Sequence, residues 1–381
     1  MSAVQRASPY AIEMEVAGDQ ARRSGRRRHE RKASRRGRHL LERNSELKNP
    51  PIRCGEEEEE DNLVIVDEDE GDKDEMRWFR RNWELAFGRS YGSFEDKTPL
   101  GPMRYTEGTI PKDACCETIV QIFSVQVTEL KDGLKWPLHV YGHVAARDLM
   151  DHNRNLLFER ERDNCQILSQ QDSSLLLTGP SRAVVIMNPV TFGVDLKVKG
   201  ETEAEDKVLS LQIFEYDRPA AYGSNAYVTH NCCSSKRSTL GFKLATLLDT
   251  VEATVVSAKV VGGSWLDHFR GRVVCRTASA SKEDIVLLDS QDGRMPITAD
   301  GEIELSRSVV SVELTGQLIF RVVASQMGDK TDVIDQAVAF FTPTVRGKSH
   351  GTCELGFCKL EVVVAWSLFS TMEDLRLQNR I

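Results

Sequence analysis

Apolar and polar residues alternate along most of the chain between positions 117 and 370. The alternation is clearest in residues 122–130, 138–144, 305–314 and 318–324. Successive side chains of a β-strand point to opposite faces of the sheet, so a period of two predicts strands with one buried face. Turn-forming pairs such as Asp132-Gly133 and Gly262-Gly263 separate these segments. The pattern predicts an all-β domain over 117–370, an antiparallel β-sandwich or barrel-like core, with residues 240–248 ambiguous between helix and strand.

Four short matches inside this region indicate an internally duplicated β unit, with repeats at about 117–250 and 251–370. The matched segments are Trp136 to Arg147 with Trp265 to Arg276, Ser181 to Val185 with Ser306 to Val310, Leu240 to Phe242 with Leu355 to Phe357, and Glu252 to Val256 with Glu361 to Ala365. The first pair is offset by 129 residues, and the order of the matches is preserved. The alternative is coincidence between β segments of similar composition. Duplication explains the preserved order of the four matches better.

The first 75 residues are predicted to be a disordered tail in which charge is segregated. Residues 1–53 carry 14 basic and 6 acidic side chains, and residues 54–75 carry 1 basic and 13 acidic ones. Blocks of like charge repel and lack the apolar residues needed for a core. The net charge of −8 therefore hides a basic arm followed by an acidic block. Residues 371–381 are expected to form a short C-terminal tail.

The basic arm contains a candidate nuclear-import patch. Its residues are Arg22, Arg23, Arg26, Arg27, Arg28, Arg31, Lys32, Arg35, Arg36 and Arg38. An importin-type receptor is one partner that such a patch predicts, and an inert solvated tail or a nucleic-acid contact are the alternatives. The neighbouring acidic block argues against strong nucleic-acid binding. Ser34 follows Arg31-Lys32-Ala33 and is a candidate phosphosite, where a phosphate would reduce the positive charge.

If the patch is an import signal, residues 1–53 fused to a fluorescent protein should accumulate in the nucleus. Replacing Arg26, Arg27 and Arg28 by alanine should reduce that accumulation, because these positive charges are what the receptor would bind. Fluorescence microscopy measures the ratio of nuclear to cytoplasmic signal. A purely cytoplasmic signal from the unsubstituted fusion would end the import hypothesis.

Between the tail and the β domain, residues 76–116 are predicted to form a short amphipathic helix and a Pro/Gly linker. Phe79, Trp83 and Phe87 recur with the spacing of one helical face, and Gly88 is a plausible stop. We expect this aromatic face to pack on the protein's own core, the alternative being a helix that presents its arginines to a partner. Pro99, Pro102 and Pro111 with the nearby glycines predict an extended strap over 90–112.

The sequence lacks the signals of several protein classes. The longest apolar runs are five residues, such as 337–341, far below the ~18 to 20 that a transmembrane helix needs. The N-terminus shows no secretory signal, and nine cysteines are an odd, sparse number that suits reduced thiols. These features predict a location in the nucleus or cytoplasm and no membrane partner.

Two motifs suggest chemistry that their surroundings do not favour. Gly347 to Gly351 satisfies the G-x-S-x-G pattern of a hydrolase nucleophile elbow around Ser349, but a strand rather than a helix is expected to follow, so we interpret it as a glycine-rich β turn. The clusters His230, Cys232, Cys233 and His350, Cys353, Cys358 lack the two matched ligand pairs of a zinc site. We therefore expect no metal and no cofactor.

A third candidate is a run of mixed charge that begins at position 147. It comprises Arg147, Asp148, Asp151, Arg154, Glu159, Arg160, Glu161, Arg162 and Asp163. Paired carboxylates could form a catalytic site there, but mixed charge at this density is typical of a solvated sheet face or exposed loop. We expect the second.

The core resembles a plant family known mainly from grasses, domain of unknown function 6598. The resemblance spans about residues 117–370, on segments that include Val120 to Val127, Trp136 to Leu138, Gly142 to Asp148, Asn153 to Phe158, Arg162 to Cys165, Thr178 to Arg182, Val194 to Gly200, Gly263 to Trp265, Phe269 to Gly271, Val286 to Ser290, Ser306 to Val310 and Ser349 to Ser367. The resemblance implies a stress or defence context but no established activity.

Some similar grass proteins carry an additional N-glycosidase domain that acts on ribosomal RNA, with an E-A-x-R pattern. Here Val144-Ala-Ala-Arg147 has valine where that pattern needs its acid. The sequence is therefore interpreted as a non-enzymatic module that binds a protein or a small molecule, the alternative being an enzyme of the N-glycosidase or serine hydrolase class.

Overall fold

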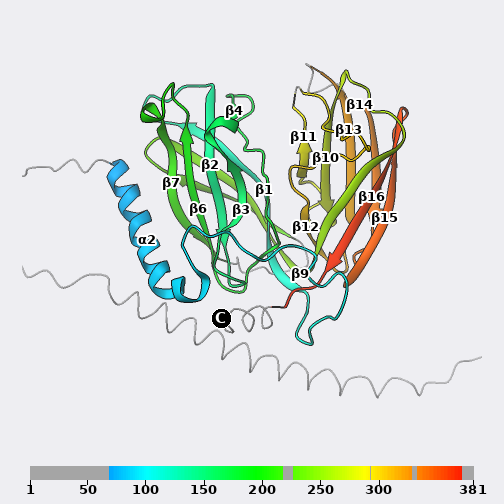
Figure 1. Ribbon diagram of the computed structural model, residues 1–381, viewed down its shortest axis with the longest axis horizontal. Coiled ribbons are helices and arrows are strands. Elements are labelled where there is room, and N and C mark those ends of the chain that lie inside the picture. Colours follow the sequence, from blue (N-terminus) through cyan, green and yellow to red (C-terminus); the bar gives the residue numbers. More distant parts are fainter. Residues whose placement is uncertain (1–67, 218–225, 292, 328–332, 371–381) are drawn as a thin grey trace, which may run out of the picture. The chain divides into compact units, whose positions relative to one another are not determined.

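The protein is seen in a computed structural model that describes residues 68–217, 226–291, 293–327 and 333–370 (Figure 1). The import patch and Ser34 lie outside these residues. The described elements are the helix α2 (Glu68–Tyr91), the short 3-10 turns η1 (Arg162–Asn164) and η2 (Glu203–Glu205), and the strands β1 (Glu117–Leu130), β2 (Leu138–Arg147), β3 (Asn155–Arg160), β4 (Gln166–Leu168), β5 (Val184–Val185), β6 (Val190–Val198), β7 (Lys207–Tyr216), β8 (Tyr227–Ser234), β9 (Ser238–Gly263), β10 (Phe269–Thr277), β11 (Ile285–Asp289), β12 (Val309–Glu313), β13 (Leu318–Gln326), β14 (Val333–Phe341), β15 (Arg346–Glu354) and β16 (Cys358–Ser367).

The strands form three antiparallel sheets, which confirms the all-β prediction. A shared sheet has the order β15-β16-β9-β1-β5, and β8 and β12 also pair with β9. A first outer sheet has the order β3-β2-β6-β7 with β4 beside β2, and a second outer sheet has the order β11-β10-β13-β14. Residues 240–248, ambiguous in sequence, lie within β9.

Each outer sheet packs on part of the shared sheet and encloses a separate apolar core. The first core combines β2, β6 and β7 with residues such as Val120 and Leu244 of the shared sheet. The second combines β10, β13 and β14 with residues such as Ile119 and Ala245. Because neighbours in a strand point to opposite faces, the two cores lie on opposite faces of the shared sheet. The architecture is therefore two β-sandwiches rather than a barrel, and Figure 1 shows the strands in two groups with β9 between them.

Strand β9 belongs to both sandwiches. Its first half pairs with β1 and β8, and its second half pairs with β12 and β16. Asp249 has a φ of 49° where the register with β1 shifts, so a local irregularity separates the halves while the strand continues. The predicted repeat boundary near 250 thus falls inside one unbroken strand.

The pairing scheme recurs between the two sandwiches. β2 pairs with β3 and β6, and β6 pairs with β7, just as β10 pairs with β11 and β13, and β13 pairs with β14. In the shared sheet, the contacts of β1 with β5 and β9 correspond to those of β9 with β12 and β16. The recurring strand pairing supports the predicted internal duplication. The duplication itself stays a prediction.

Two of the four sequence matches fit that scheme and two do not. The segments starting at Trp136 and Trp265 lead into β2 and β10, and those starting at Ser181 and Ser306 lead into β5 and β12. In contrast, residues 240–242 lie in β9 while residues 355–357 form the turn between β15 and β16. Residues 252–256 and 361–365 lie on neighbouring paired strands and are not equivalent positions. Short apolar matches recur by chance in strands, and this accounts for the two pairs that do not fit the scheme.

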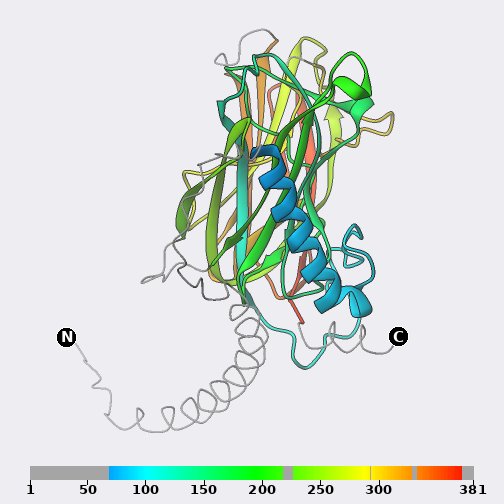
Figure 2. The same cartoon turned by 90° about the vertical axis from the view of Figure 1, so that its left-hand side faces the viewer.

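Helix α2 lies across the first outer sheet, next to β7 (Figure 2). Trp83 is 3% exposed, its ring centroid is 5.6 Å from that of Phe94, and its indole N–H donates to the carbonyl of His152 at 3.0 Å. The guanidinium of Arg147 lies 5.1 Å from the Trp83 ring. The aromatic face therefore packs on the protein itself, as the sequence predicted.

The helix is longer than residues 76–88. It begins at Glu68, in the acidic stretch that the sequence placed in the disordered tail to position 75, and it ends at Tyr91. Acidic residues near a helix N-terminus are favoured by the helix dipole. Pairs one turn apart, such as Arg77 with Asp74 at 2.7 Å, add a small further stabilisation.

Replacing Trp83 by alanine should lower the free energy of unfolding by about 3–5 kcal/mol, the usual loss for a buried large aromatic side chain. Urea unfolding followed by circular dichroism measures the change. Trp78 on the same helix is 58% exposed, so Trp78→Ala is the matched control and should change stability by less than about 0.5 kcal/mol. Equal losses in both variants would contradict the docking of this face.

Candidate functional site

The residues singled out for hydrolase chemistry do not form a nucleophile site. Ser349 lies in the middle of β15, opposite Val364 of β16, and its Oγ accepts a hydrogen bond from the Trp366 indole at 2.9 Å. The motif is therefore extended strand and not the glycine-rich turn expected from sequence. His350 is the next residue and points to the other face of the sheet, where its Nδ1 is 3.7 Å from Glu361.

The two His/Cys clusters do not converge either. Among the residues that the structure describes, no group of three or more His, Cys, Asp or Glu side chains could hold a metal ion. His230 and Cys232 are exposed on β8, whereas Cys353 and Cys358 are buried. Burial raises the pKa of Cys353 to about 12 and that of Cys358 to about 11, so both thiols are protonated at neutral pH.

The mixed-charge run beginning at position 147 is divided between surface and interior. Glu159, Glu161 and Asp163 are exposed, in agreement with the expectation of a solvated surface. Asp148 and Asp151 are not, because their side chains are 1% and 0% exposed. The solvated-surface interpretation is therefore wrong for this pair.

Both buried carboxylates bind Arg182, whose side chain is 2% exposed. The guanidinium donates to the two oxygens of Asp148 at 2.7 Å each and to Asp151 at 3.0 Å. Burial acts to lower the pKa of Arg182, but the two carboxylates outweigh burial and raise it above its ordinary value. The guanidinium holds both carboxylates in fixed positions, so we call this buried ion cluster (Arg182, Asp148, Asp151) a structural lock.

The extended strap is held beside this lock by a further buried carboxylate. Glu252 of β9 accepts hydrogen bonds from the backbone N–H groups of Ala183 and Met103, at 2.9 Å each. The hydroxyl of Thr98 donates to Asp151. The hydroxyl of Thr106 donates to the carbonyl of Trp366 at 2.9 Å. The strap therefore contacts residues of both sandwiches, as an element that fixes their junction would.

Arg147, which occupies the place of the arginine in the N-glycosidase pattern, is buried and hydrogen-bonded to the backbone. It lies in β2, as the strand-like sequence predicted, and donates to the backbone carbonyls of Phe94 and His152 at 2.6 and 2.9 Å. Burial, and secondarily Arg154, lowers its pKa to about 9. One of these hydrogen bonds holds the strap at Phe94, and the other fixes the loop between β2 and β3 at His152.

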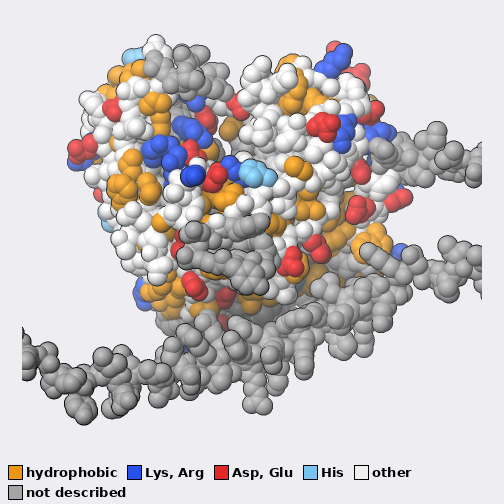
Figure 3. Space-filling view, turned by 180° about the vertical axis from the view of Figure 1, so that it is seen from behind, with side chains coloured by type: hydrophobic (Ala, Val, Ile, Leu, Met, Phe, Trp, Pro, Cys, Tyr) orange, Lys and Arg blue, Asp and Glu red, His pale blue; other side chains and the backbone are white. Residues whose placement is uncertain are grey.

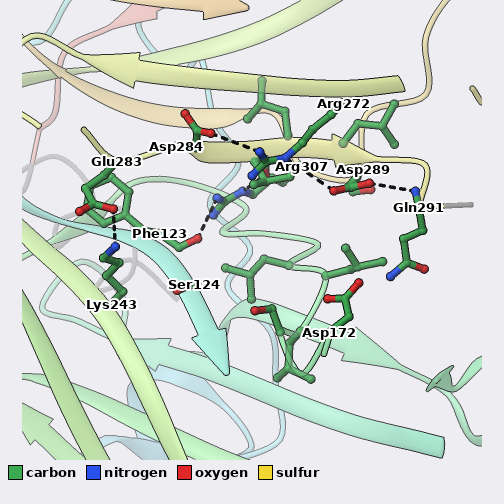
Figure 4. A pocket seen from close by; sticks show the side chains of 18 of the residues that line it. Phe123, Ser124, Asp172, Lys243, Arg272, Glu283, Asp284, Asp289, Gln291 and Arg307 are labelled. Carbon is green, nitrogen blue, oxygen red and sulfur yellow. Dashed lines mark hydrogen bonds and ion pairs between the residues drawn. The ribbon is translucent and has the colours of Figure 1, made fainter. Parts of the chain in front are cut away.

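A charged cleft lies between the two sandwiches (Figure 4). It has a volume of about 390 Å³, within the range of small-molecule pockets. One wall comes from β1, β9 and the loop before β5, and the other from β10, β11 and their flanking loops. The polar residues lining it are Ser124, Asp172, Ser174, Lys243, Arg272, Lys282, Glu283, Asp284, Asp289, Gln291, Ser306 and Arg307.

Ion pairs hold the walls of the cleft. Lys243 of β9 binds Glu283, in the loop between β10 and β11, at 2.5 Å and so bridges the two sandwiches. Arg272 lies between Asp284 and Asp289, at 3.3 and 3.6 Å. Figure 4 shows Ser124 and Asp172 across the open space from Arg272 and Asp289. These ion pairs hold Lys243, Arg272 and their carboxylate partners in place without a ligand.

Arg307 lies deep in this cleft and ties the two sandwiches together. It is 3% exposed, and its guanidinium donates to the carbonyls of Val286, Ile122 and Phe123 at 2.6, 3.0 and 3.4 Å. The register of β1 shifts between Ile122 and Ser124, and such a bulge frees carbonyls from the ladder. Sequence reasoning did not select the cleft residues, although the match between Ser181-Arg182 and Ser306-Arg307 was a signal for both buried arginines.

The fold and the cleft describe an all-β protein made of two joined sandwiches. The chain belongs to the family DUF6598, domain of unknown function, whose family model matches residues 119–364. This confirms the family assignment drawn from the sequence. The comparison with curated proteins returned no match.

Solved structures offer only remote similarity. Human GIVD cytosolic phospholipase A2 matches at 6% identity with a TM-score of 0.21, covering 68% of this chain and 33% of that one. The chain thus spans about a third of the length of that phospholipase. The calcium-bound pair of C2 domains of Extended-Synaptotagmin 2 matches at 9% identity with a TM-score of 0.22, covering 67% of this chain and 98% of that one. Scores this low carry no functional argument.

The contribution of Glu252 to the free energy of unfolding should decrease as pH rises. Burial raises its pKa, so between the ordinary glutamate pKa and the raised value the folded state binds one proton more than the unfolded state. Its contribution is fully present below the ordinary pKa and is lost as pH rises through the folded pKa. The difference in unfolding free energy between wild type and Glu252→Gln should therefore decrease with pH in that window, by at most about 1.4 kcal/mol per pH unit.

Urea unfolding at a series of pH values from 4 to 8 measures this difference. Glu304→Gln is the matched control, because it removes an exposed carboxyl group. A rising curve for Glu252→Gln would show that the carboxyl group is ionised in the folded state throughout.

Proposed function

We propose that this protein is a non-enzymatic binding module whose ligand is a small polar molecule held in the inter-sandwich cleft. The observation that carries the proposal is the cleft itself, with its volume of about 390 Å³ and its preformed charged lining. Convergent polar groups on rigid strands provide orientation and specificity without an ordering cost on binding. The family resemblance is the support for a plant stress or defence context, which affinity purification of the full chain from stressed host tissue tests.

The wider surface favours a small ligand over a polyanionic partner. On the face shown in Figure 3, basic and acidic side chains are interspersed. Protein surfaces that bind nucleic acids instead present clusters of basic side chains. In the part of the chain that the structure describes, no helix is both long and apolar enough to cross a bilayer. We propose a location in the nucleus or cytoplasm, with the import patch as its determinant.

The rival proposal is an enzyme, either a serine hydrolase or an rRNA N-glycosidase. The described surroundings of Ser349 lack the ordered base that a serine nucleophile requires, since its Oγ is bound by Trp366. The guanidinium of Arg147 is engaged by the backbone carbonyls of His152 and Phe94. These contacts support the binding module.

Filling the cleft should abolish ligand binding. Ser124 of β1 lines the space and is only partly exposed, so Ser124→Trp places an indole where the ligand would lie. Ligand-observed NMR of the full chain against a library of polar fragments should give hits that this variant loses by at least about tenfold in affinity. Thr352→Trp on the exposed face of β15 is the matched control and should retain every hit.

Fragments that bind Ser124→Trp as well as Thr352→Trp would place the site elsewhere and contradict the proposal. The same preparations, with Ser349→Ala added, address the enzyme alternative. Neither ester hydrolysis nor depurination of ribosomes should exceed background in the wild type. Activity that disappears in Ser349→Ala would overturn the non-enzymatic assignment.

A further inference from the structure

The acidic side chains of the second wall of the cleft are already paired. Asp284 is 2.5 Å from Arg276 and 3.6 Å from Arg321, in addition to its contact with Arg272. Asp289 is 3.5 Å from Arg270. Three arginines outside the lining thus share carboxylates that face the cleft. A carboxylate surrounded in this way presents little negative charge to a ligand.

With these three arginines included, seven basic groups face four carboxylates around the cleft. Asp172 is the acid on the first wall, and the other three acids are those paired as described. Positive charge is therefore in excess. A low-dielectric cleft with an excess of one sign attracts ligands of the opposite sign.

Two of the basic groups have no carboxylate partner. In the described part of the chain, no carboxylate lies within ion-pair distance of Arg307, and Lys282 forms no ion pair or hydrogen bond. Lys282 is exposed at the mouth of the cleft, in the loop that also holds Glu283. Lys282 is therefore free to contact a ligand, and among the described residues the charge of Arg307 is not neutralised by a carboxylate.

Arg307 retains donors that the protein does not use. A guanidinium has five N–H groups, and three of these are directed to the backbone carbonyls described above. Two remain on a side chain that is almost completely buried against the cleft. Burial lowers the pKa of Arg307 only to about 10, so the group remains a cation at neutral pH. A buried cation without a counter-charge is costly, and a bound anion would offset that cost.

Arg182, the other buried arginine, has a carboxylate counter-charge that Arg307 lacks among the described residues. Arg182 holds the matching place in the first sandwich and is neutralised by Asp148 and Asp151. When the offset of 129 residues that relates Arg147 to Arg276 is continued along the chain, the positions that correspond to Asp148 and Asp151 are Thr277 and Ala280, which carry no charge. The second sandwich therefore keeps the arginine without its carboxylates and leaves the counter-charge to be supplied from outside.

We infer that the cleft binds a small molecule through an oxyanion, a phosphate or carboxylate group, with Lys282 contacting it at the mouth and Arg307 supplying positive charge from the floor. This inference rests on the proposed function, since it names the ligand class of the same cleft. Planar N–H pairs of arginine match the oxygens of phosphate and carboxylate groups, and such charge-assisted hydrogen bonds are stronger than neutral ones.

The test titrates inorganic phosphate and, separately, citrate into isotope-labelled full-length protein and follows the backbone amide resonances of residues 282–291 and 306–308. Choline and glucose serve as cationic and neutral probes of comparable size. At least one of the two anions should shift these resonances saturably, and added sodium chloride should weaken its binding. The anion that binds distinguishes a phosphate from a carboxylate preference.

Lys282→Gln should weaken the affinity for that anion by about tenfold, the loss of one charge-assisted contact. Lys112→Gln removes another exposed lysine and should leave the affinity unchanged. Ser306 lines the cleft next to Arg307. Ser306→Asp should therefore abolish anion binding, because its carboxylate repels the anion. Ser306→Asn introduces a neutral side chain of nearly the same size as Asp and should retain binding. Equal binding by the Asp and Asn variants would overturn the inference.

The outcomes separate the two proposals. If choline or glucose shifts the cleft resonances and neither anion does, the oxyanion inference is wrong and the ligand site stands. If neither the probes nor any fragment perturbs these resonances, the proposed function itself is wrong. Anion shifts that persist unchanged in Lys282→Gln and Ser306→Asp would show binding outside the cleft and would overturn the inference as well.

Discussion

The rest of the structure depends on the continuity of β9. This strand of 26 residues supplies a pairing edge to both sandwiches, and its alternate side chains enter cores on opposite faces of one sheet. A sheet hydrogen-bonded along its whole length cannot hinge without breaking its ladder. The continuous ladder of β9 therefore restricts hinge motion between the two sandwiches, and the cleft lies between them.

Buried charge has two uses in this protein. Around Arg182 the carboxylates of Asp148 and Asp151 balance the guanidinium, and Glu252 and Thr98 connect the same region to the strap. Such a cluster contributes little net stability relative to apolar packing but strongly disfavours any other arrangement, because each partner left alone would be a buried unpaired charge. Around Arg307 only neutral carbonyls compensate the charge. The same residue type at matching places thus locks one sandwich and leaves the other able to bind an anion.

These features cooperate to preorganise the cleft. Lys243 crosses it to Glu283, and Arg307 fastens the second sandwich to the bulge in β1. Helix α2 and the strap then cover the first outer sheet and the junction through Trp83 and Arg147. A ligand entering such a site does not have to order the walls, so little of its binding free energy is lost to conformational entropy.

The sequence by itself determined the local properties of this protein. The period-two pattern identified the strands, aromatic spacing identified the packed face of α2, and the residues of the β domain identified the family, because these signals depend on near neighbours in the chain. The cleft and the buried lock were decided by tertiary structure alone. Asp148 and Arg182 are 34 residues apart, and Arg307 meets Ile122 across 185 residues, so no local pattern shows that one arginine is neutralised and the other is not. Burial and pairing set the charge available to a ligand, and both are properties of the folded chain.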